Sequence, residues 1–268
     1  MNNFAAPRKS LGQNFLQDAN IINKIVSGLA ATDSDIVVEI GPGRGALTDQ
    51  ILPLVGELHL IEFDHDLVRY WQQRGEAQSH LQVHSSDVLK FDFNEIIQKI
   101  DRPLKVIGNL PYNISSPVLF HLMKYAEHIH SQVVMLQKEV VERMASKPGS
   151  KQYGRLSVML QQRYDIEYLF TVPPGAFFPP PKVDSAIARL TPLSEVPHPV
   201  DSGDDFAKVV KQAFSQRRKT LRNTLKGLLD SEQIESVGVQ PSARAETLEI
   251  KEFSALANKL SQISAESE

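Results

Sequence analysis

The chain has 268 residues, of which 41% are hydrophobic and 23% are charged, as is usual for a globular protein. It contains no cysteine, which excludes disulfides and thiolate metal sites and argues against a zinc-dependent nucleobase deaminase. The net charge of −3 gives no general sign of a nucleic-acid partner, so such a surface would have to arise from local clustering of basic residues.

No apolar run approaches the roughly 18 to 20 residues of a membrane span. Arg8 and Lys9 stand near the N-terminus, but the apolar block of a secretory signal does not follow them. We therefore expect a cytoplasmic protein with no membrane partner, and the sequence indicates no metal site.

Short apolar or β-branched segments alternate with amphipathic stretches from Ser34 to about Ser194, which predicts βαβ units and a mostly parallel sheet. The predicted parallel strands are residues 36–40, 58–62, 81–84, 104–107 and 132–136, and helices are expected at, for example, 46–55 and 116–125. Two further strands, 166–172 and 186–190, flank a proline-rich loop and are expected to close the sheet as an antiparallel edge.

Residues 191–204 are rich in proline, serine and acid, which is typical of a linker. The segment beyond them has helical periodicity and no convincing strand. We therefore predict three parts: an N-terminal segment with a Rossmann-like α/β domain over 1–194, a linker over 195–204, and a small all-α domain over 205–268.

A glycine-rich turn follows the first predicted strand. Gly41, Gly43 and Gly45 form the pattern G-x-G-x-G, and the acid Glu39 precedes it. Glycines let the backbone approach a ligand closely at the start of a helix. The spacing differs from the G-x-G-x-x-G of dinucleotide sites, which argues against a nicotinamide-dependent dehydrogenase.

Acidic residues stand at the ends of the next two strands. Glu62, about 20 residues beyond the turn, could accept hydrogen bonds from both ribose hydroxyls of an adenosyl group. Asp87 could accept one from the adenine amine of the same cofactor. Either acid alone could be a solvated residue at a strand end, but the ordered set favours an adenosyl cofactor.

The fourth predicted strand ends in the sequence Asn109, Leu110, Pro111, Tyr112. An adenine N6 amine is a poor nucleophile, and hydrogen-bond acceptors on both its protons favour the reactive pyramidal form. The Asn109 side chain and the Leu110 carbonyl could be these acceptors, with Pro111 restricting Leu110 and Tyr112 stacking on a flipped base. An ordinary β-turn is the alternative, but the preceding glycine turn and acids favour an amino-methyltransferase.

At this point the sequence resembles the ribosomal RNA adenine dimethyltransferase family, and the likeness spans nearly the whole chain. The matching motifs are LGQNFL at 11–16, EIGPG at 39–43, GNLPYNIS at 108–115, LQKEV at 136–140, YGRLS at 153–157, FFPPPKVDS at 177–185, FSQRRKTLRN at 214–223 and RAE at 244–246.

The resemblance implies S-adenosylmethionine as the cofactor and dimethylation of two neighbouring adenines near the 3′ end of 16S rRNA in an immature small (30S) subunit. It implies a Rossmann-like methyltransferase sheet, and residues 13–16 would fold over the cofactor. Phe177 resembles the aromatic that faces Tyr112 across the target base; a core aromatic is the other interpretation. The cofactor contacts that it carries over are Asn14, Leu16, Gly41, Glu62, Asp87 and Asn109.

Basic residues are concentrated between Phe206 and Leu229, a stretch with no acid. In a helical projection the apolar residues share one side, and all the basic residues but Arg217 project from the other. The polar run 215–220 could divide the stretch into two helices. Such a stripe suits phosphate contacts, whereas a merely solvated face normally mixes both charges. We predict RNA contact, with the binding residues Arg217, Arg218, Lys219 and Arg222.

Two other functions remain open. A 23S rRNA adenine methylase of the antibiotic-resistance type is possible in principle, but residues 216–223 and 244–246 argue against it. An RNA-binding assembly or transcription factor could keep the fold without catalysis, although the intact Glu62, Asp87 and Asn109 argue against that. Nothing in the sequence suggests a dimer, so we expect a monomer.

Overall fold

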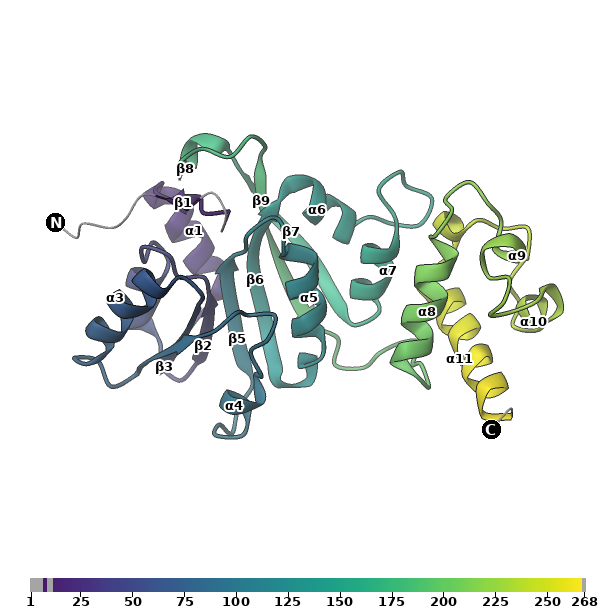
Figure 1. Cartoon of the computed structure of the whole chain (residues 1–268), viewed down its shortest axis with the longest axis horizontal. Coiled ribbons are helices and arrows are strands. Elements are labelled where there is room, and N and C mark those ends of the chain that lie inside the picture. The colour runs from purple at the N-terminus through teal and green to yellow at the C-terminus, as the bar shows by residue number, and fades with distance from the viewer. Residues whose placement is uncertain (1–6, 9–11, 267–268) are drawn as a thin grey trace. The chain divides into compact units, whose positions relative to one another are not determined.

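The computed structural model describes residues 7–8 and 12–266 (Figure 1). Lys9 and Leu11, which the sequence patterns used, lie outside the described residues. The chain forms two compact units, the first made of Met1–Val141 and Asp165–Pro192 and the second of Glu142–Tyr164 and Leu193–Glu268. The second unit thus includes residues 142–164, which the sequence interpretation assigned to the sheet domain. The predicted linker over 195–204 stays a prediction.

The first unit is built on a seven-stranded sheet with the order β4-β3-β2-β5-β6-β9-β7. Neighbours from β4 to β6 are parallel, and β9 runs antiparallel to β6. The predicted α/β class and the parallel strands are therefore confirmed. The strands are β2 (Ile36–Ile40), β3 (Glu57–Glu62), β4 (Leu81–Ser85), β5 (Leu104–Asn109), β6 (Ile129–Gln137), β7 (Tyr164–Val172) and β9 (Ser185–Pro192).

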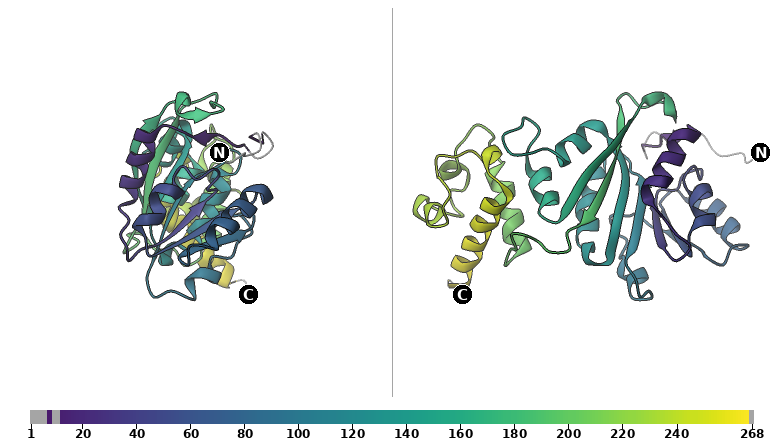
Figure 2. Two further views of the ribbon diagram at one scale, coloured as in Figure 1. Left: turned by 90° about the vertical axis from the view of Figure 1, so that its left-hand side faces the viewer. Right: turned by 180° about the vertical axis from the view of Figure 1, so that it is seen from behind.

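Helices cover both faces of this sheet, so its central strands are buried on both sides. Figure 1 shows α5 in front of β5 and β6, and the view from behind in Figure 2 shows α1 on the other face. All five residues of β2 are buried, which explains why this strand is apolar at every position but Glu39. The helices of this unit are α1 (Ala19–Leu29), α2 (Thr48–Ile51), α3 (His65–Gly75), α4 (Asn94–Ile97), α5 (Ser115–Met123) and α6 (Lys138–Met144, which continues into the second unit).

Two sequence predictions for helices differ from the structure in their bounds. The stretch predicted as one helix over 46–55 is the short α2 followed by a 3₁₀ turn, Leu52–Leu54. Pro53 lies in the first turn of that 3₁₀ segment, and a proline cannot donate the backbone hydrogen bond that would continue α2. The helix predicted over 116–125 is α5, which ends at Met123.

The order of the strands places a topological switch at β2. The chain runs from β2 outward to β3 and β4 on one side, then returns to β5 on the other side of β2. In open parallel sheets the crevice at such a switch, beyond the carboxyl ends of the strands, is where ligands bind. The fold therefore points to the region beyond Ile40 and Asn109.

Apart from Tyr164, the first residue of β7, the described residues of the second unit form only helices and turns. In it α8 and α11 pack together, and the rings of Phe214 and Phe253 stack with centroids 5.6 Å apart. Tyr153 packs edge-on against Phe214 and donates to the carbonyl of Leu248 at 3.0 Å. These contacts explain why residues 142–164 belong to this unit. Its helices are α7 (Arg155–Gln161), α8 (Gly203–Ala213), α9 (Leu221–Thr224), α10 (Ser231–Ser236) and α11 (Ile250–Glu266).

Gly108→Ala tests the close packing of β5 on β2. A Cβ at Gly108 would lie 2.7 Å from the carbonyl oxygen of Ile40, so we expect a loss of about 1–3 kcal/mol in the free energy of unfolding, as for other overpacked sites. Chemical denaturation would measure it. Gly175→Ala is the control, because nothing lies within 4 Å of the added Cβ. Equal stability of the two variants would contradict the packing argument.

Candidate functional site

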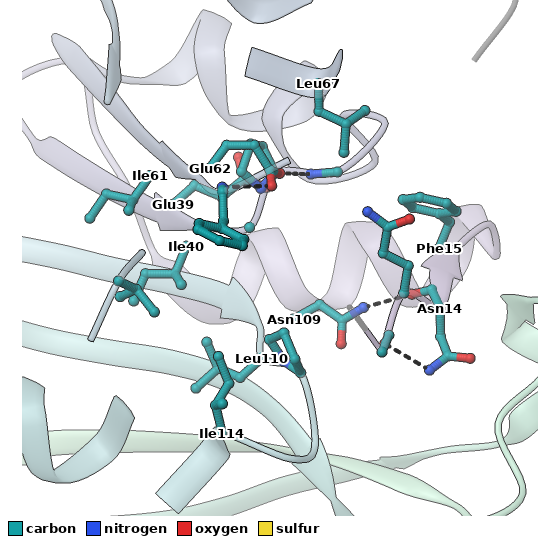
Figure 3. A pocket seen from close by; sticks show the side chains of 18 of the residues that line it. Asn14, Phe15, Glu39, Ile40, Ile61, Glu62, Leu67, Asn109, Leu110 and Ile114 are labelled. Carbon is teal, nitrogen blue, oxygen red and sulfur yellow. Dashed lines mark hydrogen bonds between the residues drawn. The ribbon is translucent and has the colours of Figure 1, made fainter. Parts of the chain in front are cut away.

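A cavity of about 280 Å³ opens at the carboxyl ends of the central strands (Figure 3). The N-terminal segment, the glycine turn and the loops after β3, β4 and β5 form its walls. Every residue that the sequence assigned to the cofactor lines it, together with the predicted catalytic turn: Asn14, Leu16, Gly41, Glu62, Asp87, Asn109, Leu110, Pro111 and Tyr112.

The glycine turn after β2 adopts a left-handed backbone, which glycine takes up without steric cost. Gly41 has φ +67° and Gly43 has φ +55°. A Cβ at Gly41 would meet no atom within 4 Å, so the missing side chain leaves open space beside the cavity. The indole Nε1 of Trp71 donates to the carbonyl of Gly43 at 3.0 Å, which fixes the turn from behind. The turn therefore presents backbone, not side chains, to a ligand.

Glu62 is a buried carboxylate held by backbone donors. Its Oε1 accepts from the amides of Phe63 at 2.9 Å and Asp64 at 2.8 Å, and its Oε2 accepts from the amide of Gly43 at 3.3 Å. Burial raises the pKa of Glu62, and these three hydrogen bonds oppose that rise. The carboxylate is thus an oriented acceptor bonded to the glycine turn.

Glu39, the acid before the glycine turn, has a different environment. It is 1% exposed, and its Oε2 accepts one hydrogen bond, from the hydroxyl of Thr48 at 2.7 Å. Burial raises its pKa from 4.5 to about 8, against the effect of the Thr48 bond and with the help of nearby Asp49 and Glu62. At neutral pH Glu39 is therefore a neutral acid that ties β2 to α2.

Asn109 stands at the end of β5 with its amide oriented by the N-terminal segment. Its Nδ2 donates to the carbonyl of Asn14 at 3.0 Å, and its amide oxygen points away from Asn14 (Figure 3). The next residue, Leu110, donates its backbone amide to the carbonyl of Met135 on β6 at 3.1 Å. Hydrogen bonds thus anchor the first two residues of the turn.

The N-terminal segment crosses the cavity and is fastened at several points. Its short strand β1 (Phe15–Leu16) pairs antiparallel with β8 (Phe177–Phe178). The guanidinium of Arg44 lies 4.4 Å from the centre of the Phe15 ring. Sequence reasoning assigned nothing to Arg44, and no local pattern would have revealed this contact with a residue so distant in sequence.

The first residues of the segment are tied to the loop after β3. Arg8 forms an ion pair with Asp64 at 3.0 Å, and the Gln13 amide donates to the same carboxylate at 3.0 Å. Asp64 is itself the N-cap of α3. These contacts hold the segment next to the Glu62 wall of the cavity.

Of the two aromatic residues predicted to sandwich a base, one lines the cavity and the other is buried in the core. Tyr112 is half-buried and lines the cavity, and its hydroxyl is 2.6 Å from that of Ser185. Phe177 is 4% exposed, packs in the hydrophobic core with Leu16, and is not among the residues lining the cavity. This burial agrees with the core interpretation of Phe177, and its contact with a base stays a prediction.

The basic stretch lies in the second unit and divides as expected, since α8 ends at Ala213 and α9 begins at Leu221. Arg217 is paired with Glu246 at 2.8 Å, and Lys208 with Asp205 at 2.9 Å. The other basic side chains are exposed: Lys211, Arg218, Lys219, Arg222 and Lys226. The opposite side is buried: Phe206, Val209, Val210, Ala213, Leu221 and Leu225.

Among the residues that the structure describes, no group of three histidine, aspartate or glutamate side chains could hold a metal ion. Across the same part of the chain, no helix has the length and apolar character needed to cross a membrane.

Comparison with known proteins gives one consistent result. The sequence model of the family described as "Ribosomal RNA adenine dimethylase" matches residues 5–262. The protein named "Ribosomal RNA small subunit methyltransferase A" from Laribacter hongkongensis is 49% identical over 253 residues, covering 94% of this chain and 95% of that protein. The protein of the same name from Hydrogenovibrio crunogenus is 51% identical over 253 residues, with the same coverage of both chains.

Solved structures agree with these relatives. A dimethyladenosine transferase from Plasmodium falciparum superposes with a TM-score of 0.78 and 26% identity, covering 90% of this chain and 95% of that one. The 23S rRNA methyltransferase ErmE superposes with a TM-score of 0.67 over 93% of this chain and 100% of its own, but at 24% identity it supports the fold alone.

The protonated state of Glu39 predicts how stability depends on pH. Because folding raises its pKa from 4.5 to about 8, the folded chain holds a proton in this window that the unfolded chain releases. The free energy of unfolding should therefore fall as pH rises through the window. Glu39→Gln keeps an oxygen for Thr48 and cannot ionise, so the fall should be smaller. At pH 8 the variant should therefore be more stable than the wild type. Its Tm should be higher by about 2–4 °C for each kcal/mol of added stability.

Thermal unfolding of both proteins from pH 5 to pH 8 would measure this difference. Glu62, whose pKa is raised in the same direction, should preserve part of the slope in the variant. Glu232→Gln, at an exposed acid of α10, is the control and should leave the slope unchanged. A wild-type slope in Glu39→Gln would show that Glu39 is not the buried acid responsible.

Proposed function

Since the chain belongs to the ribosomal RNA adenine dimethylase family, we propose that it dimethylates the N6 amines of two adjacent adenines near the 3′ end of 16S rRNA, using S-adenosylmethionine. The observation that carries this proposal is that the Asn109–Tyr112 turn lines the same cavity as Glu62 and the glycine turn. The high identity to small-subunit methyltransferases over 94% of the chain supports the choice of rRNA.

The cavity fits S-adenosylmethionine in size and in its donors and acceptors. Its volume of about 280 Å³ is near the lower end of the range for small-molecule sites. The open space beside Gly41 lets the backbone approach the ligand, and the buried Glu62 carboxylate suits a ribose diol. Asp87 would accept from the adenine amine, and the segment from Asn14 to Leu16 would cover the ligand. When bound, the cofactor supplies an electrophilic methyl group.

The chain's own contribution is to hold a purine amine in a reactive form. Because the Asn109 Nδ2 donates to Asn14, the amide oxygen is the atom available to accept from the amine. The Leu110 carbonyl accepts from the second amine proton, and Pro111 restricts the backbone that carries it. These acceptors favour the pyramidal nitrogen, and Tyr112 stacks on the base. Catalysis then consists mainly of alignment and electrostatic fit.

We also propose that the second unit binds rRNA through the exposed cations of the stretch between Phe206 and Leu229. Arg218, Lys219 and Arg222 lie in the turn and the helix after α8, with the buried apolar residues on the opposite side. Arg217 would act mainly through its ion pair with Glu246, which braces the turn. An rRNA substrate would place this protein in the cytoplasm and allow a role in small-subunit assembly. We also propose that the protein acts as a monomer.

The alternatives account for fewer of the observations. A 23S rRNA methylase is supported only by the fold of ErmE, whereas relatives named for the small subunit are about half identical over nearly the whole chain. A non-catalytic RNA-binding protein would have no use for an oriented Asn109 in the same cavity as a buried, oriented Glu62. The observations therefore favour an enzyme that methylates adenines of small-subunit rRNA.

Asn109→Ala tests the catalytic proposal. Purified protein would be given labelled S-adenosylmethionine with unmethylated small subunits, naked 16S rRNA or large subunits, and mass spectrometry would locate the methyl groups. Wild type should modify adenine N6 in 16S rRNA. Asn109→Ala should lose about 10²- to 10³-fold in kcat, as when one oriented catalytic group is removed elsewhere, while it remains folded. Near-normal turnover would refute the assigned role of Asn109.

Charge reversal at Arg218 and Arg222 tests the RNA surface. Arg218→Glu with Arg222→Glu should weaken RNA binding and lower its salt dependence, by a slope of about 1 for each lost phosphate contact. Filter binding at several salt concentrations would measure both. Lys90→Glu with Lys124→Glu makes the same change of charge at exposed lysines of the first unit. An equal effect of both pairs would mean that overall charge, not this surface, governs binding.

A further inference from the structure

The hydroxyl of Tyr112 is hydrogen-bonded to a serine far away in sequence. Its oxygen lies 2.6 Å from the Oγ of Ser185, 73 residues further along the chain. Tyr112 belongs to the turn after β5, and Ser185 is the first residue of β9. The bond therefore joins the catalytic turn to a strand that carries none of the cavity's other proposed functional residues.

Ser185 occupies a rigid position in the sheet. It is fully buried, with 0% of its surface exposed, and it pairs with Gln137 in the antiparallel ladder of β6 and β9. Just before it, the carbonyl of Asp184 accepts from the amide of Lys138 at 3.0 Å. The Ser185 hydroxyl is thus a fixed point at the end of the sheet.

The strand between these two residues also fixes the turn itself. Met135 on β6 pairs with Asn109 on one side and with Ile187 on the other, and its carbonyl accepts from the amide of Leu110. One strand therefore sets the register of both β5 and β9. As a result, the distance from the start of the catalytic turn to Ser185 is determined by the sheet.

The bond to Ser185 acts on a part of Tyr112 that the other hydrogen bond does not reach. Ser115 donates its hydroxyl to the backbone carbonyl of Tyr112 at 3.1 Å, a bond that fixes the main chain and does not restrain the χ1 and χ2 angles of the ring. The bond to Ser185 holds the far end of the ring. Because Tyr112 is half-buried and lines the cavity, part of its surface remains open towards it.

We propose that Ser185 is a positioning residue for methyl transfer, which holds the Tyr112 ring at the orientation in which it stacks on the target adenine. This inference rests on the proposed function, in which Tyr112 contacts the base. A ring that is already oriented loses less conformational freedom when the base arrives. Small errors in the position of the base lower the rate strongly, because the amine and the methyl group must be aligned. The effect should fall on turnover with RNA and leave the binding of S-adenosylmethionine unchanged.

A double-mutant cycle tests this inference. Ser185→Ala and Tyr112→Phe each remove one partner of the bond and keep the ring. Each should lower kcat/KM for unmethylated small subunits about tenfold, close to 1.4 kcal/mol. The double variant should be no slower than Tyr112→Phe alone, because the two hydroxyls act as one unit. Calorimetry should give wild-type affinity for S-adenosylmethionine in all three.

Ser131→Ala is the matched control, since Ser131 is a buried serine on β6 that lies outside the cavity. It should keep wild-type turnover, which would show that loss of a buried hydroxyl from this sheet is not itself harmful. If Ser185→Ala does not fold, Tyr112→Phe alone still decides, because wild-type kcat/KM in that variant would overturn the inference.

Two further outcomes separate this inference from the proposed function. If the losses of kcat/KM from the two single substitutions multiply in the double variant, the positioning role is overturned and the proposed function is left intact. Wild-type turnover in Tyr112→Ala would instead show that no ring is needed at this position, so that the stacking part of the proposed function fails. Methylation of an RNA group other than an adenine amine would contradict the function itself.

Discussion

The parallel pairing of β2 with β5 is the constraint from which the site follows. Ile40 and Gly108 are partners in this ladder, and the two strands approach so closely at Gly108 that a Cβ would lie 2.7 Å from the carbonyl oxygen of Ile40. Both strands then end at the same edge of the sheet. β2 leads into the glycine turn, and β5 leads into the Asn109 turn. Residues separated by nearly 70 positions therefore face one cavity because neighbouring parallel strands end together.

Two buried glutamates near this pairing, Glu39 and Glu62, show how different surroundings give side chains of one type different roles. Glu62 accepts three backbone hydrogen bonds, which favour its charged form, whereas Glu39 accepts one from a hydroxyl and has a pKa of about 8. Desolvation acts on both, and the number of donors determines how far it is opposed. Glu39 is consequently suited to a structural bond between β2 and α2, and Glu62 to the recognition of a ligand with hydroxyl donors.

The sequence was sufficient for those parts of the fold and site that depend on local spacing. Alternating strand and helix patterns predicted the sheet, and the glycine turn, the strand-end acids and the Asn109 turn predicted the residues of one cavity. Contacts between distant segments were out of reach: the Arg44–Phe15 contact, the Tyr112–Ser185 bond and the packing of residues 142–164 on the helical unit. No periodicity encodes these contacts, because each depends on which elements meet after the chain has folded. Pro53 was a local signal that the helix prediction over 46–55 overlooked.

The N-terminal segment links the two halves of the site. The carbonyl of Asn14 orients the amide of Asn109, so its position decides whether the oxygen or the nitrogen of that side chain is offered to an amine. Two residues further on, Leu16 pairs with Phe177, and both pack in the same hydrophobic core. The segment that crosses the cavity therefore also orients the Asn109 amide and buries the predicted base-stacking aromatic. A displacement of β1 would alter all three together, since they depend on one short pairing with β8.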